Sequence, residues 1–237
     1  MDEHEHNNQD THQRPARSGK GLRWRPWPCP NCDSSLTALR LLAGSAGANP
    51  ALPESTPEKL AAEQVSQLLA WAQSCPHHSD QTLTLPKIAE GSEHEVFFRA
   101  DDAMVFKTTR LGTYGESYYL HENRVYQRQC SPLEYLIRLT LWDEVFHSAP
   151  QSLGISTSGQ IISAQPYITG ALPTQETVDE FLLASGFSDV KRHCFLWKKT
   201  YGTFDIWLGD ARDENFVETP LGLVPIDVRM WFTEAEE

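Results

Sequence analysis

The residues best suited to chemistry lie near the C-terminus, in the segment GDARDENFV. Four residues separate Asp210 from Asn215, and Asp227 follows the apolar stretch VPI. At this spacing a loop can aim one carboxylate at an acceptor hydroxyl and an amide oxygen at a metal ion. Asp227 adds a second carboxylate, and oxygen ligands suit Mg²⁺. The pattern predicts phosphoryl transfer, although an Asx-rich loop and a solvent-facing Asp227 are the structural alternatives.

A second group of suitable residues lies upstream. The segment IAEGSEHEV carries Gly91 and Val96, and the strand-like MVFK carries Lys107. A glycine lets the backbone approach a phosphate, and a lysine on a rigid strand holds a point charge against phosphate oxygens. The segment QPYITG, residues 165–170, could offer backbone groups to adenine. The alternatives are a turn glycine and an ordinary edge-strand lysine.

Taken in this order, the segments resemble the polyvalent protein kinase family, which comprises minimal bacterial kinase-like domains. The resemblance covers roughly residues 88–231 and includes PLEYLIRL at 132–139. It implies an α+β, protein-kinase-like fold with an antiparallel N-lobe sheet and an abbreviated C-lobe. It also implies a phosphotransferase that uses ATP and magnesium, with an unknown protein or small-molecule acceptor.

The resemblance also implies roles for individual residues. Asp210 would serve as the base or orient the hydroxyl, and Arg212 stands where kinases often keep a cation near the transferred group. Asn215 and Asp227 would hold magnesium. The expected ATP-binding residues are Gly91, Val96, Lys107, Glu134, Gln165 and Tyr167.

The carboxylate partner of Lys107 has two candidates. The family suggests Glu134, which is also the fourth residue of a Ser-Pro-Leu-Glu capping box. Glu122 lies nearer to Lys107 in the sequence. We favour Glu134.

Departures from the kinase pattern keep two non-catalytic alternatives open. Gly91 is the one loop glycine retained, Leu208-Gly209 replaces His-Arg, and Val228-Arg229 follows Asp227 in place of Phe-Gly. A nucleotide-binding pseudokinase is one alternative, and a zinc-containing interaction module without catalysis is the other.

The organisation along the chain predicts three parts. Residues 1–21 read as a disordered tail, 22–80 as a small helical module with Cys and Trp, and 81–237 as the kinase-like domain. Within the module a tetrahedral zinc site is possible, with His77 competing for the last position and free thiols as the alternative. Its ligands would be Cys29, Cys32, Cys75 and His78.

The composition indicates which classes of partner and which cellular compartment to expect. The 20 Lys and Arg against 32 Asp and Glu give a formal charge of −12, which repels nucleic acid despite an Arg- and Trp-rich stretch at 14–27. No apolar run is long enough for a membrane span, and the N-terminal residues lack a secretory signal. Five cysteines without a disulfide framework favour reduced thiols in the cytoplasm.

Hydrophobic periodicity predicts the elements that must position these residues. Helices are expected at 55–73, 131–146 and 174–186, and a Gly- and Tyr-rich loop at 112–119. Strands are expected at 82–88, 96–99, 103–107, 152–155 and 160–168, and short strands and loops at 195–227.

Overall fold

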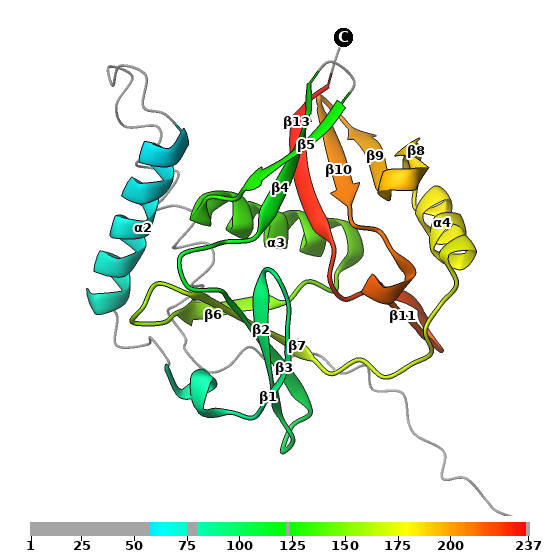
Figure 1. Ribbon diagram of the computed structural model, residues 1–237. Coiled ribbons are helices and arrows are strands. Elements are labelled where there is room, and N and C mark those ends of the chain that lie inside the picture. Colours follow the sequence, from blue (N-terminus) through cyan, green and yellow to red (C-terminus); the bar gives the residue numbers. More distant parts are fainter. Residues whose placement is uncertain (1–56, 75–79, 122–123, 236–237) are drawn as a thin grey trace, which may run out of the picture. The chain divides into compact units, whose positions relative to one another are not determined.

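Every sheet in the described residues is antiparallel, and three α-helices accompany the sheets. The computed structural model describes residues 57–74, 80–121 and 124–235, all within the compact unit Asp33–Glu237 (Figure 1). This confirms the α+β class. The predicted tail of residues 1–21 and most of the predicted module of residues 22–80 lie outside the described residues.

The larger sheet has five strands in the order β1-β2-β3-β7-β6. They are β1 (Lys87–Glu90), β2 (His94–Arg99), β3 (Met104–Thr109), β6 (Gln151–Ile155) and β7 (Ile161–Pro166). β3 is central, and all its residues from 105 to 109 are buried. The strands predicted at 96–99 and 103–107 are confirmed.

Strand register places the expected ATP-binding side chains together. Val96 is directly opposite Lys107, and Gln165 is opposite Val105. Opposed residues of antiparallel strands share a face, as do residues two apart on one strand. Val96, Lys107 and Gln165 therefore share one face of the sheet.

The strand predicted at 82–88 is wrong in its first half, where η1 (Asp80–Thr84) is a 3-10 turn. The N–H of Leu85 donates to the carbonyl oxygen of Thr82 at 3.2 Å. Pro86 has no N–H to offer a neighbouring strand, so the strand begins only after it.

Helix α3 (Pro132–Phe146) begins where a capping box predicts. The Ser131 side chain accepts from the N–H of Glu134, and the Glu134 side chain accepts from the N–H of Ser131. Such a box satisfies two N–H groups that the first turn leaves without partners. The helix ends at His147, which has left-handed backbone angles. The helix predicted at 131–146 is confirmed.

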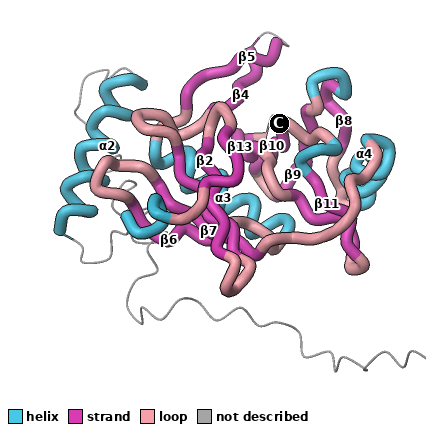
Figure 2. Tube along the Cα trace, turned by 60° about the horizontal axis from the view of Figure 1, so that its bottom comes forward, coloured by secondary structure: helices cyan, strands magenta, loops and turns pink. Residues whose placement is uncertain are grey.

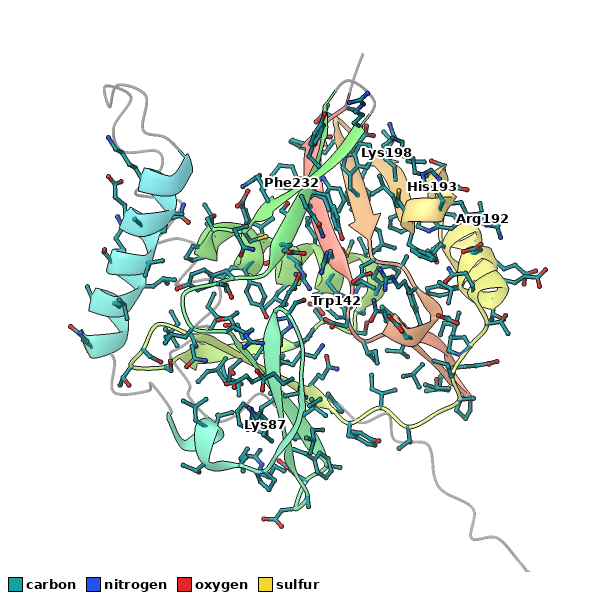
Figure 3. All side chains as sticks on the ribbon, viewed as in Figure 1. Lys87, Trp142, Arg192, His193, Lys198 and Phe232 are labelled. Atoms are coloured by element: carbon teal, nitrogen blue, oxygen red, sulfur yellow. The ribbon has the colours of Figure 1, made fainter. Side chains whose placement is uncertain are left out.

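Helix α3 links two hydrophobic cores. Leu136 packs in one core with Leu68 of α2 (Pro57–Ser74), and the backbone N–H of Leu133 donates to the side chain of Gln64. Trp142, six residues further along the helix (Figure 3), belongs to the other core and is 1% exposed. The helix predicted at 55–73 is confirmed as α2.

The second sheet has four strands in the order β13-β10-β9-β8. They are β8 (Ser188–Lys191), β9 (Leu196–Tyr201), β10 (Phe204–Gly209) and β13 (Arg229–Glu234). Helix α4 (Gln175–Ala184), capped by Thr174, packs beside them and confirms the third predicted helix (Figure 2). A separate hairpin, β11 (Phe216–Thr219) and β12 (Gly222–Pro225), lies between β10 and β13 in the sequence.

A further hairpin was not expected from the sequence. β4 (Glu116–His121) and β5 (Arg124–Gln129) pair where the loop was predicted to continue to residue 119. The segment lacks clear apolar alternation, so its pairing depends on distant contacts, such as Tyr118 packing against Trp231 of β13 at 5.5 Å between ring centroids.

None of the helices in the described ranges combines the length and apolar composition that crossing a membrane requires.

Candidate active site

Pairing between β10 and β13 brings the two aspartates of interest to the same end of one sheet. Gly209, the last residue of β10, pairs with Arg229, the first residue of β13. Asp210 therefore leaves the sheet where the chain returns from Asp227 (Figure 1). Neighbouring strands lie about 5 Å apart, so the register alone holds these segments close.

The loop after β10 is fixed by Asn215. Its side-chain N–H donates to the backbone oxygen of Asp210 at 2.7 Å. Its backbone oxygen accepts from the N–H of Ile226 at 2.8 Å. Asp210 has φ +58, a conformation uncommon for a residue other than glycine and one that functional sites often retain. Asn215 thus connects the turn at Asp210 to Ile226, the residue that precedes Asp227.

Lys107 reaches this position from the other sheet. Its ammonium donates to the backbone oxygen of Ile226 at 2.7 Å and lies 3.3 Å from Oδ1 of Asp227. The Lys107 side chain is 10% exposed, whereas the Asp227 side chain is 47% exposed. The Asp227 carboxylate is therefore held by a cation and still open to a ligand.

A buried arginine, a largely buried arginine and a buried glutamate lie behind the aspartates. Nη1 of Arg138 lies 2.7 Å from Oε2 of Glu93, and Nε of Arg229 lies 2.8 Å from Oε1 of the same carboxylate. Arg138 also donates to the backbone oxygen of Val228 at 3.0 Å. These contacts join the turn before β2, helix α3 and the start of β13.

The pKa values follow from this concentration of charge. Partial enclosure of the Asp227 carboxylate would raise its pKa, but Lys107 and Arg138 outweigh this effect and hold the pKa well below its usual range. Burial likewise opposes ionisation of Glu93, while Arg138 and Arg229 lower its pKa. Burial lowers the pKa of His94 to about 4, so this imidazole is neutral at pH 7. Both carboxylates are ionised at neutral pH.

The arrangement fits a magnesium ion that shares its ligands with a phosphate. Oδ2 of Asp227 and the side-chain oxygen of Asn215 accept no hydrogen bond from the part of the chain that the structure describes. Mg²⁺ typically takes one or two carboxylates together with substrate phosphates. Among the described residues no three His, Cys, Asp or Glu side chains form a metal-binding group, so the protein would supply only part of the coordination shell.

The remaining expected residues lie on the turn before β2, on β7 and just after its end, and on the loop after β10. Gly91 is exposed in the turn before β2, and its oxygen accepts from Arg110 at 2.9 Å. Arg212 lies 3.1 Å from Oδ1 of Asp210. Gln165 is buried on β7, and Oε1 has no donor within the described ranges. The N–H of Tyr167 donates to the oxygen of Ala103 at 2.8 Å.

Glu134 does not approach Lys107 in the structure. Its carboxylate pairs with Arg128 and accepts from the N–H of Ser131 at 2.8 Å. The capping role and this ion pair together occupy the side chain. Glu122 and the expected zinc ligands lie outside the described residues; those ligands are Cys29, Cys32, Cys75 and His78.

Sequence reasoning did not select Glu93, Arg138 or Arg229. Arg138 had a usable signal: it lies three residues after Tyr135 and four before Trp142, on the stripe that α3 buries. An arginine on such a stripe needs a buried anion. Nothing in the sequence indicated that Glu93 would supply it.

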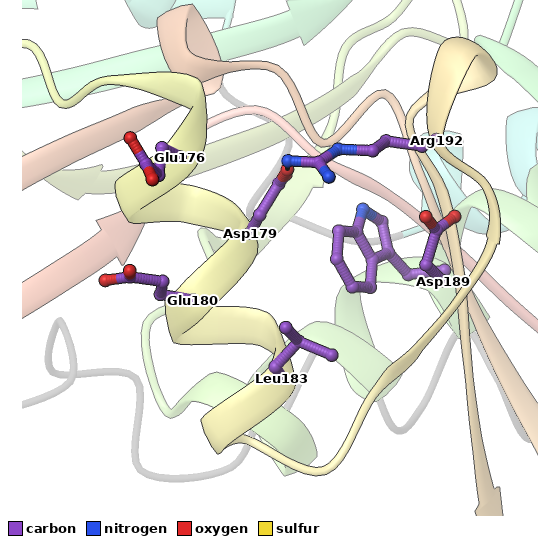
Figure 4. A pocket seen from close by; sticks show the side chains of 7 residues that line it. Glu176, Asp179, Glu180, Leu183, Asp189 and Arg192 are labelled. Carbon is purple, nitrogen blue, oxygen red and sulfur yellow. Dashed lines mark ion pairs between the residues drawn. The ribbon is translucent and has the colours of Figure 1, made fainter.

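A separate cavity lies between α4 and β8 (Figure 4). It holds about 200 Å³ and includes an ion pair of 2.5 Å between Arg192 and Asp179. Its lining shares no residue with the cluster around Lys107 and Asp227. The cavity is therefore separate from the residues expected to bind ATP and magnesium.

Comparison with known families identifies a relationship over most of the chain. The family model described as serine/threonine/tyrosine kinase found in polyvalent proteins matches residues 61–233. The matched range includes Lys107, Asp210, Asn215 and Asp227. No match was found among curated proteins or among solved structures.

Proposed function

Because the chain belongs to the family of serine/threonine/tyrosine kinases found in polyvalent proteins, we propose that it is a phosphotransferase dependent on ATP and magnesium. The observation that carries the proposal is the contact of Lys107 with Asp227 beside the Asp210–Asn215 loop. The five-stranded sheet with α3 would form the N-lobe. The four-stranded sheet and α4 would form a short C-lobe.

ATP would lie against the face of the five-stranded sheet that carries Val96, Lys107 and Gln165. Lys107 is a strand-borne point charge suited to the α- and β-phosphates. The buried Oε1 of Gln165 lacks a donor among the described residues, and an adenine amino group could supply one. Gly91 and Tyr167 lie on the turn and the strand end that flank this face.

Transfer would follow the in-line course of kinases. The acceptor oxygen forms a bond to the γ-phosphorus, the bond from that phosphorus to the β–γ bridging oxygen breaks, and ADP leaves with the bonding electrons. Asp210 would receive or orient the hydroxyl proton, while Arg212 offers a cation beside it. Magnesium, held by Asn215 and Asp227, would supply charge neutralisation on the phosphates. The family description favours a serine, threonine or tyrosine hydroxyl as acceptor.

A nucleotide-binding protein without catalysis is a second candidate, favoured by one contact. Arg212 lies 3.1 Å from Oδ1 of Asp210 and pairs with the carboxylate that would serve the acceptor. Phosphate transfer to a generic acceptor protein or to the chain itself separates the two candidates.

Thermal unfolding with ATP, with and without Mg²⁺, tests the proposal. A ligand that binds the folded state raises the melting temperature. We expect a magnesium-dependent rise for the wild type and for Asp189→Ala, an exposed carboxylate of the separate cavity. Asp227→Ala should abolish the rise. An unchanged melting temperature for the wild type, at ATP well above millimolar, would contradict the proposal.

A further inference from the structure

Behind the site, three side chains connect the two aspartates and complete a series of five alternating charges. In order they are Asp227, Arg138, Glu93, Arg229 and Asp210. The links to Glu93 measure 2.7 and 2.8 Å, whereas both links to the aspartates measure 3.9 Å. Each arginine thus gives its short contact to the central glutamate and only a distant one to an aspartate.

From these distances we propose that Glu93 is a positioning residue that keeps Arg138 and Arg229 away from Asp227 and Asp210. The inference rests on the proposed function, in which Asp227 holds magnesium and Asp210 meets the acceptor. An arginine in direct contact with Asp227 would compete with the metal for the same oxygens. Glu93 prevents this by supplying the nearer anion.

Burial makes the competition severe. The side chains of Arg138 and Glu93 are 3% and 8% exposed, so neither can exchange its partner for bulk water. A buried guanidinium that loses its carboxylate takes the next anion within reach. For Arg138 this is Asp227, because its bond to the Val228 oxygen keeps it beside that residue.

The two arginines are not equally free to move. Arg229 also lies 3.3 Å from Glu116 and donates to the hydroxyl of Tyr118, so it keeps other partners if Glu93 loses its charge. Arg138 has no other carboxylate within the described ranges except Asp227. The main effect of Glu93 is therefore expected at the magnesium ligand.

The arrangement also differs from the protein-kinase pattern at α3. Protein kinases pair this lysine with a glutamate of the neighbouring helix. Here the helix contributes Arg138, and the compensating carboxylate comes from the turn before β2. A glutamate is needed there because the helix adds a positive charge next to a metal ligand.

The test measures the Mg²⁺ concentration that gives half of the ATP-induced rise in melting temperature. Glu93→Gln should raise this concentration about tenfold, as loss of a supporting contact around a metal ligand commonly does. Adding Arg138→Gln to Glu93→Gln should return it towards the wild-type value, because the competing cation is gone. A side chain with a purely structural role would show additive losses instead.

Two further variants distinguish a specific effect of Glu93 from a general loss of structure. Glu93→Asp keeps the charge on a shorter side chain and should raise the Mg²⁺ concentration less than Glu93→Gln. Asp205→Asn removes a buried carboxylate that pairs with Lys198 at 2.9 Å, at the other end of β10. It should lower the melting temperature without changing the Mg²⁺ concentration required.

The outcomes separate the two proposals. A wild type without any magnesium-dependent rise would overturn the proposed function itself. A normal wild type whose Mg²⁺ requirement stays unchanged in both Glu93→Gln and Glu93→Asp would overturn the role of Glu93. So would a double variant that is no better than Glu93→Gln.

Discussion

The ammonium of Lys107 lies 3.3 Å from Oδ1 of Asp227, although 120 positions separate them in the sequence. The pair joins the five-stranded sheet to the start of β13, which belongs to the four-stranded sheet. In the proposed reaction, the lysine and the aspartate would both serve the phosphates, one directly and the other through the metal.

Lys107→Met should remove most of the ATP-induced rise in melting temperature. The methionine keeps the aliphatic stem but loses the charge that faces the phosphates. Lys87→Met is the matched control, because Lys87 is an exposed residue of β1 whose ion pairs among the described residues are with Glu90 and Glu95. An unaffected nucleotide response in Lys107→Met would show that Lys107 serves the fold alone.

Asp210→Asn should preserve nucleotide binding and lower the rate of phosphate transfer by about 10²–10⁴-fold, the usual contribution of a general base. Asparagine tolerates the left-handed conformation that Asp210 adopts at φ +58, so the loop should keep its shape. Single-turnover transfer and thermal shift measured on the same preparation separate rate from binding. Loss of both would place Asp210 in nucleotide binding instead.

Gly91→Ala should leave the fold intact and weaken ATP binding. An added Cβ at Gly91 would meet only the oxygen of His94, at 4.0 Å, so the fold itself does not require glycine there. At Gly170 the same atom would come 2.1 Å from the backbone oxygen of Glu218. Gly170→Ala should therefore cost about 3 kcal/mol of unfolding free energy. If Gly91→Ala binds ATP normally, Gly91 is simply a turn residue.

The stability of the protein should fall in mild acid because of His94. The pKa of His94 is about 4 in the folded state against about 6.5 when unfolded, so the unfolded state binds a proton more readily between these values. Stability is therefore lost as pH falls through this window, by about 2 kcal/mol from pH ~7 to pH ~5. Asp227 and Glu93 have lowered pKa values, so the stability that these carboxylates contribute is lost only in stronger acid.

Urea unfolding at the two pH values measures this loss. His94→Gln should flatten the pH dependence, whereas His193→Gln, an exposed position, should retain the wild-type slope. Equal slopes in the wild type and His94→Gln would rule out His94 as the cause.

Local signals account for the elements that the sequence predicted well. The capping box at Ser131 and the turn between β2 and β3 depend on neighbouring residues, and both were recognisable. The 3-10 turn at η1 (Asp80–Thr84) was missed because alternating Thr and Leu also suits a strand. The hairpin of β4 and β5 was missed because distant contacts such as Tyr118 with Trp231 support it.

The residues of the proposed site also differ in whether local sequence or distant packing determines them. Lys107, Asp210, Asn215 and Asp227 follow motif spacing, and the structure brings their segments together. The partners of the neighbouring arginines could not be derived, since the partners of a buried charge depend on packing between separate elements. Glu134 shows the opposite case, in which a local capping signal competed with a family expectation.

Because Gly209 of β10 pairs with Arg229 of β13, the backbones of Asp210 and Asp227 extend from one sheet and move with it. Drawing them apart would break main-chain hydrogen bonds between two paired strands. Lys107 belongs to the other sheet, and its side chain contacts the backbone oxygen of Ile226 and the carboxylate of Asp227. Any switch that turns this protein on or off would act most easily by tilting one sheet against the other, with the spacing of the two aspartates left unchanged.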